Sequence, residues 1–508
     1  MNFGALWFKN VNGPLPSRNS TAVATLGFAY WMKRVLDEVA RVGADLAPDP
    51  VHDLRVALRR CRSMGDGLTA IDPDPNWKAM KKAGKVLFDS LGELRDVQVM
   101  SEWVRKLGPP DDPETKALLD SLAHREHAQK LLASNVVRSF DVRQWRKWGR
   151  ELPRRAARVK RGSIVFKHLA LERWTTAYDL HRRALRNRSQ TAWHDLRIAV
   201  KRFRYIVENF LPQQHRLWSN DLKELQDLLG DVHDLDVLWA TAIEVNAFAG
   251  EESRGRWYAM VREARDKRIA RYEERTVGPK SLWRVWRTEL PREDQIQAAA
   301  MARMKLWASF LDPDFEHSQR VALLADQLYE GLYKLGLDTP NTEHDPRKLL
   351  RAAALLHDVG KARREKDHHR MSYRLIRRMP LPLGFAALDL QLAAVVARFH
   401  RGTLPQSRHK LMRTLAPSDK NLVLRLAGML RFANAFDGTG DNRVPRLQVE
   451  QKNGTLVVSA TGYSPWATNA EKISSARHLL ELVLRKPIVV KALRSTRSRV
   501  ARMQAQSK

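Results

Sequence analysis

Apolar residues recur at three- and four-residue spacing along most of the chain, which is the period of an α-helix that buries one face. The pattern is clearest in TLGFAYWMKRVLDEVARVG, KALLDSLAHREHAQKLLAS and HSQRVALLADQLYEGLYKLG. A strand signal stands near the C-terminus, where LQVEQ and TLVVSATG flank Asn453-Gly454, a dipeptide that favours a hairpin turn. The pattern therefore predicts a mostly α-helical protein up to about residue 440, followed by a small α/β segment.

The helical part contains an internal repeat. HDLRVALRRCRS at 52–63 matches HDLRIAVKRFRY at 194–205, with seven identities in twelve positions. A second pair, LGELRDVQV from Leu91 and LGDVHDLDV from Leu229, follows the first at nearly the same distance in both copies. Two blocks in the same order predict a tandem duplication of a helical unit of about 140 residues.

Each repeat places basic residues along one helix face, at positions i, i+3, i+7 and i+10. The two stripes are His52, Arg55, Arg59 and Arg62 in the first copy, and His194, Arg197, Lys201 and Arg204 in the second. Like charges at this spacing repel one another, and a bound anion would relieve the repulsion. Guanidinium groups suit phosphate because they donate two parallel hydrogen bonds. The alternatives are a solvated helix face, or pairing with Asp96 and Asp234 of the second block.

The charge of the whole chain also points to an anionic partner. Its 508 residues include 89 Lys+Arg and 57 Asp+Glu, a net charge of +32. Nucleic acid, anionic lipid, or a phosphate-rich polymer or metabolite would fit, unless the charge serves solubility alone. The single cysteine, Cys61, excludes a disulfide framework or a multi-thiolate metal site within the chain. We expect a cytoplasmic protein, because no membrane span or signal-peptide pattern is visible.

The paired HDLRVALRR and HDLRIAVKR segments, each followed by an LG block, resemble the CHAD family, the conserved-histidine α-helical domain, over roughly residues 20–250. The resemblance implies two four-helix halves related by pseudo-twofold symmetry around a basic groove that binds inorganic polyphosphate. The matching positions are His52, Arg55, Arg59, Arg60, Arg62, Lys85, Arg95, His194, Arg197, Lys201, Arg202, Arg204 and Lys223. One departure is His233 at the position that corresponds to Arg95. Histidine is largely uncharged near neutral pH, so this exchange would weaken polyphosphate binding by the second half.

Polyphosphate also fits these stripes on physical grounds. It carries about one negative charge per phosphate and has no bases to be read, so an array of Arg and Lys would bind it with a steep salt dependence. Nucleic acid is the less favoured partner, because the stripes lack interleaved exposed aromatic residues for base stacking. We therefore expect a cytoplasmic polyphosphate-binding protein that associates with polyphosphate granules.

A second group of candidate residues begins after about residue 295. It comprises a histidine that opens an amphipathic helix, a His-Asp pair that ends an apolar one, and further His and Asn residues downstream. Imidazole and carboxylate groups can hold a divalent ion such as Mn²⁺, Mg²⁺ or Fe²⁺ and activate water for phosphoester cleavage. The candidate ligands are His317, His357, Asp358, His368, His400 and Asn434. Lys361, three residues after Asp358, is a candidate phosphate contact.

The segments AALLHDVGK, HHRMSYRLI and LRFANAFD resemble the HD superfamily. They are more similar to the helical HD-like domain of the exopolyphosphatase/guanosine pentaphosphate phosphohydrolase family, over about residues 310–440. Two departures matter: Asn434 replaces a metal-binding aspartate, leaving only the later Asp437, and the actin-like catalytic part of that family has no counterpart. The histidines are therefore buried remnants of a degenerate HD fold, a phosphate site without catalysis, or an active metal site.

These observations predict a mostly α chain in four parts. They are a duplicated helical domain at 18–285 with repeats at about 18–150 and 160–285, an HD-like helical domain at 295–440, a small α/β subdomain at 441–495, and a basic tail at 496–508. The segment RGRWYAMVREARDKRIARYEERT either completes the first domain as a long basic helix or forms an interdomain strut. We expect a polyphosphate-binding protein rather than an enzyme. The alternative is an HD-type metal-dependent phosphohydrolase acting on polyphosphate or a phosphorylated nucleotide.

Overall fold

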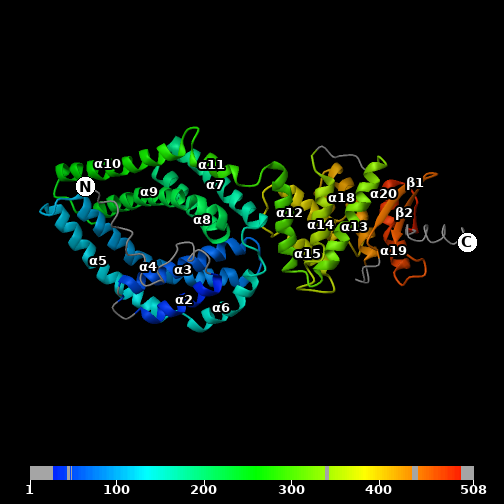
Figure 1. Ribbon diagram of the computed structural model, residues 1–508, viewed down its shortest axis with the longest axis horizontal. Coiled ribbons are helices and arrows are strands. Elements are labelled where there is room, and N and C mark those ends of the chain that lie inside the picture. Colours follow the sequence, from blue (N-terminus) through cyan, green and yellow to red (C-terminus); the bar gives the residue numbers. More distant parts are fainter. Residues whose placement is uncertain (1–26, 43–45, 47, 338–342, 438–443, 494–508) are drawn as a thin grey trace, which may run out of the picture. The chain divides into compact units, whose positions relative to one another are not determined.

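The computed structural model describes residues 27–42, 46, 48–337, 343–437 and 444–493 (Figure 1). These residues are mostly helical, with a small three-stranded sheet near the C-terminal end, so the predicted fold class is confirmed. They form two compact units, of which the first runs to Arg292, except for Ile71–Pro73, and the second comprises Ile71–Pro73 and the residues from Glu293 onward. The predicted basic tail and the beginning of the predicted first repeat lie outside the described residues.

The first unit consists of two similar series of helices. The first series is α2 (Phe28–Arg41), α3 (Pro48–Thr69), α4 (Pro75–Leu107), α5 (Pro113–Arg138) and α6 (Val142–Ala156). The second is α7 (Ile164–Asn187), α8 (Gln190–Phe210), α9 (Pro212–Glu244), α10 (Glu251–Thr276) and α11 (Leu282–Thr288). Helices α4 and α9 both have 33 residues, and α5 and α10 both have 26. The repeated sequence blocks therefore correspond to repeated structure, with α3 matching α8 and α4 matching α9.

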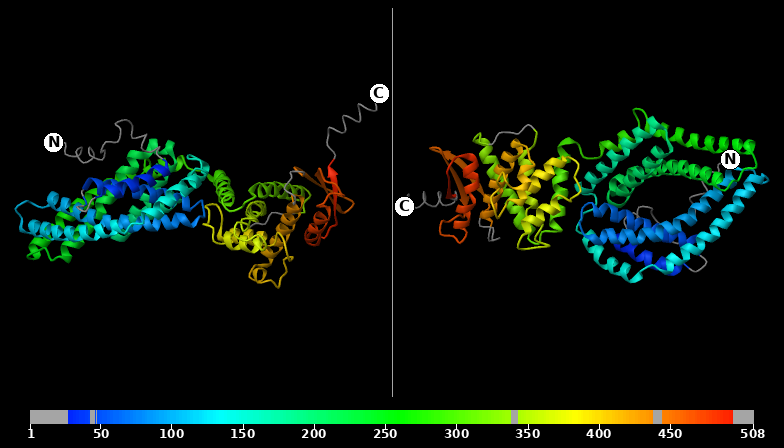
Figure 2. Two further views of the ribbon diagram at one scale, coloured as in Figure 1. Left: turned by 90° about the horizontal axis from the view of Figure 1, so that it is seen from below. Right: turned by 180° about the vertical axis from the view of Figure 1, so that it is seen from behind.

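Local sequence explains where these helices begin and which face they bury. Proline occupies the first turn of α4, α5 and α9, where its missing N–H costs nothing. Asp74 and Asp112 cap α4 and α5 by accepting hydrogen bonds from backbone N–H groups. Apolar residues such as Leu54 on α3 and Leu196 on α8 are fully buried. The two series pack together through α3 with α8 and α4 with α9, as Figure 2 shows.

The long basic segment after residue 250 completes the first unit as α10, which is the first of the two predicted alternatives. Four of its seven arginines pair with acidic residues of α9 at 2.6–3.2 Å. The pairs are Arg265–Asp236, Arg268–Asp231, Arg271–Glu224 and Arg275–Asp221. Tryptophans fill the core behind these helices. Trp193, beside His194, is only 2% exposed and lies edge-on against Tyr272 at 5.6 Å between ring centroids.

The second unit begins with a helical bundle around one hydrophobic core. Its helices are α12 (Glu293–Ser309), α13 (Phe315–Lys334), α14 (Pro346–Leu356), α15 (His368–Ile376), α16 (Ala387–Arg398), α17 (Lys410–Arg413) and α18 (Pro417–Phe436). Helices α13, α14, α16 and α18 pack against one another, and α15 covers α16. Residues such as Leu324, Leu350 and Leu430 are at most 1% exposed in this core.

The predicted hairpin is confirmed at the C-terminal end of this unit. Strands β1 (Leu447–Lys452) and β2 (Thr455–Thr461) are antiparallel, and Asn453 and Gly454 between them have φ values of 48° and 76°. Both values are positive, as a two-residue hairpin turn of this kind requires. After α19 (Ala470–Ala476) and α20 (His478–Leu484), a third strand, β3 (Ile488–Leu493), pairs parallel to β2. The sequence pattern did not single out β3.

Candidate functional site

The two predicted basic stripes lie on facing helices of the first unit. The pKa of Lys201 on α8 is lowered to about 8, first by burial and then by the charges of the nearby Arg197 and of arginines of α3 that include Arg59. Burial likewise lowers the pKa of Arg55 on α3 to about 10, against the opposing effect of Asp96. Side chains of both repeats therefore share one electrostatic environment. We call Arg55, Arg59, Arg197 and Lys201 the cationic cluster.

No carboxylate neutralises the cationic cluster at short range. Among the described residues, no ion pair of 4.0 Å or less involves any of its four members. Arg55 instead donates to the backbone oxygen of Phe88 at 3.3 Å and lies 4.8 Å from the centre of that ring. The arginines of α10, by contrast, all pair with acids. Pairing of the cluster with Asp96 and Asp234, one of the alternatives from sequence, is therefore not seen at ion-pair distance.

Arg60 and Arg204 have a different environment from the cationic cluster. Arg60 on α3 lies 2.6 Å from the buried carboxylate of Glu208 on α8, and Arg204 lies 4.0 Å from the same carboxylate. Burial opposes the ionisation of Glu208, but these two arginines still hold its pKa below the usual range. Arg60 thus links the two repeats and is already paired.

Three more of the predicted cations lie near acids of their own repeat. Arg62 and Lys85 lie 3.9 and 3.5 Å from Asp89, and Arg95 lies 3.3 Å from Glu102. All five side chains are half-buried or exposed. Pairs at such positions contribute little energy, so the three cations remain available to an anionic ligand that offers a closer contact.

The remaining predicted residues lie on the same helices. His52 and Arg202 are exposed, and Lys223 is half-buried on α9. The rings of His194 and His233 are 5.0 Å apart. Burial, followed by the charge of Arg197, lowers the pKa of His233 to about 4, so this histidine carries no charge at neutral pH.

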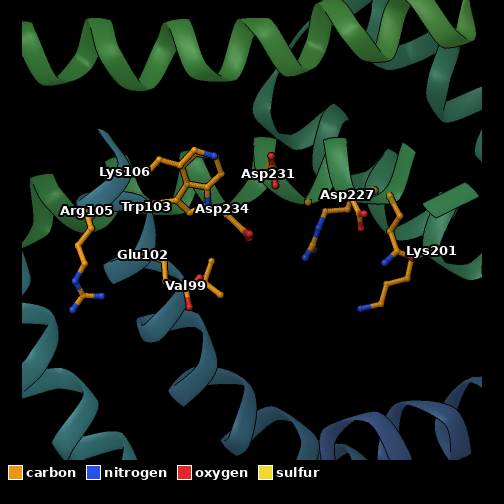
Figure 3. Close-up of a pocket in the computed structure, with 12 residues that line it drawn as sticks. Val99, Glu102, Trp103, Arg105, Lys106, Lys201, Asp227, Asp231 and Asp234 are labelled. Atoms are coloured by element: carbon orange, nitrogen blue, oxygen red, sulfur yellow. The ribbon is translucent and has the colours of Figure 1, made fainter. Parts of the chain in front are cut away.

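A cavity of about 780 Å³ opens between α4, α8 and α9 (Figure 3). Both basic and acidic residues line it. The basic ones are Arg105, Lys106, Arg197 and Lys201, and the acidic ones are Glu102, Asp227, Asp231 and Asp234. Asp231 is neutralised by Arg268 of α10 at 3.2 Å, and burial raises the pKa of Asp234 to about 6. Arg105 and Lys106 were not among the predicted site residues, because they lie two turns beyond the repeated block.

The second unit gathers the predicted metal ligands around one carboxylate. The Nε2 atoms of four histidines lie 3.0 Å (His368), 3.4 Å (His357), 3.6 Å (His400) and 3.7 Å (His317) from the oxygens of Asp358. All five side chains are buried. They come from α13, the end of α14, the start of α15 and the residues after α16. We call these five residues the histidine cluster.

Backbone carbonyls fix the orientation of three of these imidazoles. The Nδ1 atoms of His357, His368 and His400 lie 2.7–2.8 Å from the carbonyl oxygens of Ala354, Glu365 and Ala397. Because a carbonyl only accepts, Nδ1 carries the proton in each neutral ring, and Nε2 presents its lone pair to the cluster. This is how histidines that bind metals are held. His357 Nε2 and Asp358 Oδ1 are also buried without a hydrogen-bond partner, which a bound cation would supply.

The protonation states in the histidine cluster suit a metal ion. Burial lowers the pKa of His357 and of His400, so both rings are neutral at pH 7. Burial disfavours the charged form of Asp358, but the contacts of its carboxylate with His368 and Lys361 favour that form and hold its pKa below the usual range. Two sets of three ligands could each hold an ion and share Asp358, namely His317, His357 and Asp358, and Asp358, His368 and His400.

Asn434 and Asp437 both contact His317. Asn434 Oδ1 lies 2.9 Å from His317 Nε2, and Asp437 Oδ2 lies 2.8 Å from Nδ1. Asp437 is itself held by Arg320 at 3.0 Å. Asn434 therefore faces the cluster as a candidate ligand, whereas Asp437 orients the imidazole from behind. From sequence Asp437 had no assigned role.

Comparison with known proteins gives a different family match for each of the two units. Residues 30–242 match the family model of the CHAD domain, and residues 304–469 match that of Ppx/GppA phosphatase, domain III. The chain joins these two types of domain. The crystal structure of the CHAD domain from the plant Ricinus communis is similar over 51% of this chain and 88% of that chain, with 21% identity and a TM-score of 0.36. The search of curated proteins found no match.

The resemblances to the CHAD family and to the exopolyphosphatase/guanosine pentaphosphate phosphohydrolase family are thus confirmed. Among the described residues, no helix is both long and apolar enough to span a bilayer. The CHAD domain contains the cationic cluster, and domain III contains the histidine cluster.

Two glycines of the sequence motifs keep these sites in place. In the CHAD domain, a Cβ on Gly92 of the first LG block would lie 3.1 Å from Arg55 Nη1. In domain III, a Cβ on Gly360 would overlap the carbonyl oxygen of His368 and lie 2.6 Å from Ser372 N. Close approach of the backbone therefore requires glycine at 360, whereas a side chain at 92 would need the flexible end of Arg55 to shift by a few tenths of an ångström. Gly360 lets α15 approach closely enough to bring His368 to Asp358.

Lys361 also lies at the histidine cluster. Its ammonium group contacts Asp358 Oδ2, and its side chain is 27% exposed. It is thus positioned between the buried ligands and the surface. Its predicted contact with a phosphate group remains a prediction.

Proposed function

We propose that the CHAD domain of this chain binds inorganic polyphosphate along the cationic cluster. The observation that supports this function is the group of four cations, two from each repeat, that have no carboxylate partner at ion-pair distance in the part of the chain that the structure describes. A linear polyanion would contact both stripes and relieve their mutual repulsion, which already lowers the pKa of Lys201. Such binding would bring the chain to polyphosphate granules in the cytoplasm.

The surroundings of the cluster favour a ligand without bases. Phe88 lies under the guanidinium groups of Arg55 and Arg62, at 4.8 and 4.7 Å from its ring centre. Tyr205 is half-buried beside Lys201. Neither ring is open for base stacking, on which single-stranded nucleic-acid binding depends. Polyphosphate needs only the charges and the hydrogen-bond donors.

The test is a titration of the full chain with long-chain polyphosphate at several salt concentrations. We expect affinity to fall steeply with salt, and Arg59→Ala or Arg197→Ala to reduce it about tenfold, the effect of losing one charge-assisted contact. Arg262→Ala on the exposed side of α10 is the matched control, because Arg262 is 66% exposed and pairs with the exposed Asp266 of its own helix. Equal losses in all three variants, or equal competition by single-stranded DNA at the same phosphate concentration, would contradict the proposal.

We infer metal-dependent phosphohydrolase activity of domain III as a second candidate function. The observation that favours it is the convergence of four Nε2 atoms on Asp358 in a buried site. Asp358 with two histidines on each side would hold the metal, and Asn434 offers a further oxygen ligand. A divalent ion in such a site would supply a water of lowered pKa and polarise a phosphoryl oxygen. Lys361 would contact the phosphate group at the edge of the cluster.

Phosphate release from polyphosphate and from phosphorylated nucleotides, with Mn²⁺, Mg²⁺ or Fe²⁺ added, tests this activity. We expect His357→Ala and Asp358→Ala to abolish turnover and to lower the metal content. His478→Ala, an exposed histidine of the same unit, is the control and should retain both. Metal binding without turnover on any of these substrates would leave domain III as a binding or structural module.

A further inference from the structure

A second cluster of ligand-type side chains lies in domain III. It consists of Glu343 and His344 before α14, Asp389 in the first turn of α16 and Asp419 in the first turn of α18. The histidine cluster and the neighbouring Asn434 are at the other end of these three helices, where His357 follows α14, His400 follows α16 and Asn434 lies near the end of α18. Since α16 has 12 residues, the two ends are about 18 Å apart along it. This second cluster has no part in either proposed function.

One nitrogen of His344 is held by a carboxylate. Its Nδ1 lies 2.8 Å from Asp389 Oδ1. Lys348 contacts the other oxygen of Asp389 at 2.6 Å, and the backbone N–H of Ala386 donates to it as well. Asp389 is therefore ionised and fully partnered, and it places the proton of the neutral imidazole on Nδ1. Carboxylates orient histidines that bind metals in the same way.

The other nitrogen of His344, Nε2, faces Asp419 Oδ1. His344 Nε2 and Asp419 Oδ1 are both buried without a hydrogen-bond partner, and they lie 3.5 Å apart. His344 is 8% exposed and Asp419 5%. Two buried polar atoms without hydrogen bonds lower the stability of the fold unless a ligand binds both of them. Two ligands of one tetrahedral Zn²⁺ at about 2.0–2.1 Å would be about 3.3–3.4 Å apart, close to the observed separation.

A third ligand stands at the surface of this cluster. A carboxylate oxygen of Glu343 lies within 4.8 Å of both His344 and Asp419 ligand atoms, and Glu343 is exposed. We propose that Glu343, His344 and Asp419 form a site for a Zn²⁺-type divalent ion, with water as the fourth ligand. The ion would fasten the segment before α14 to the first turn of α18. Asp389, which touches only the imidazole, is a positioning residue.

The competing arrangement is a protonated His344 between Asp389 and Asp419, with no metal. In that arrangement His344 Nε2 and Asp419 Oδ1 make only a long contact of 3.5 Å, and no ion is bound. Measuring the number of bound metal ions per chain therefore distinguishes the two arrangements.

The experiment uses the full chain, stripped with a chelator, reloaded with Zn²⁺ and dialysed. The double variant His357→Ala/Asp358→Ala disables the histidine cluster, and in this background we expect one Zn²⁺ per chain and a Zn²⁺-dependent rise in Tm. Adding Asp419→Asn to the double variant should remove both the bound Zn²⁺ and the Zn²⁺-dependent rise in Tm. Glu343→Gln, at an exposed position, should weaken binding about tenfold or more without lowering the Tm of the metal-free chain, and Glu471→Gln on α19 is the exposed control.

Visible absorption of tetrahedral Co²⁺ in the same background gives a second readout of the site. An unchanged metal count after Asp419→Asn, or no bound Zn²⁺ in the double variant, would overturn the proposal. Failure of the histidine cluster to bind metal would be seen separately, as equal Zn²⁺ counts in the parent chain and the double variant.

Discussion

Arg60 on α3 lies 2.6 Å from Glu208 on α8, and this ion pair connects the two repeats of the CHAD domain. Asn209, the next residue on α8, donates to the hydroxyl of Ser63 on α3 at 2.9 Å. Arg59, next to Arg60 in the chain, belongs to the cationic cluster instead. Adjacent arginines of one motif thus have different roles, because successive helical residues point about 100° apart.

Arg60→Ala should therefore destabilise the CHAD domain. Glu208 is 8% exposed and would lose its closest cation, although Arg204 would remain at 4.0 Å. Removing one partner of a fully buried pair costs about 3–5 kcal/mol, and we expect about 2–3 kcal/mol here because the Arg60 side chain is partly exposed. Chemical denaturation measures this loss, and Arg60→Ala/Glu208→Gln should recover part of it. An unchanged unfolding midpoint would show that the pair does not join the repeats.

The same pair has a pH signature. The pKa of Glu208 is held below its usual value, so its contribution to stability is present above about pH 4.3 and is lost as the pH falls through the lower folded-state pKa. The stability of the Arg60→Ala variant should depend less on pH in this acidic range. Thermal unfolding of both proteins between pH 3 and pH 6 checks the difference.

Polyphosphate affinity should fall as the pH rises past 8. Lys201 has a pKa of about 8 in the free protein, and a bound polyanion would raise it toward the usual value of about 10.4. Binding is therefore favoured below pH 8, and it should be about tenfold weaker at pH 9 than at pH 7. Lys201→Arg should remove most of this dependence, because guanidinium stays protonated. The prediction is contradicted if wild type and Lys201→Arg lose affinity equally.

Gly360→Ala should damage the histidine cluster without touching a ligand. A methyl group there would overlap the backbone of α15 and push His368 away from Asp358. Overpacking of this kind costs about 1–3 kcal/mol, and we also expect reduced metal content. Gly255→Ala on α10, where nothing lies within 4 Å of the added atom, is the matched control. Normal metal content in Gly360→Ala would mean that His368 is not a ligand.

Asn434→Asp should strengthen metal binding. The amide oxygen already lies 2.9 Å from His317 Nε2, and a carboxylate in its place would add a negative charge to the same ligand set. We expect about a tenfold higher affinity for Mn²⁺, measured by competition with a chelating dye. Unchanged affinity would place Asn434 outside the coordination sphere.

The sequence predicted those features that depend on local spacing. The three- and four-residue period predicted the helices, the Asn-Gly turn predicted the hairpin, and the repeated blocks predicted two matched helical series. The sequence also grouped the residues of the histidine cluster, which the structure brings together near helix ends in a small bundle, and metal binding by them stays a prediction.

Features that depend on tertiary packing could not be predicted. Arg60 and Arg59 are equally basic in the sequence, and only the position of Glu208 on α8 distinguishes them. His344 stands in a polar stretch without a motif, and its partners Asp389 and Asp419 come from the starts of two other helices. Asp437 gave no signal of its role, because it acts through the imidazole of His317.

The cationic cluster takes two members from each repeat, so neither repeat could form it alone. A single-repeat ancestor would have assembled the same surface only as a symmetric dimer, at concentrations high enough for two copies to meet. Covalent fusion makes the second stripe permanently present. It also frees the halves to diverge, since a substitution in one is no longer copied into the other. The exchange of Arg95 for the neutral His233 at the corresponding position is one such asymmetry, which an obligate homodimer could not have acquired.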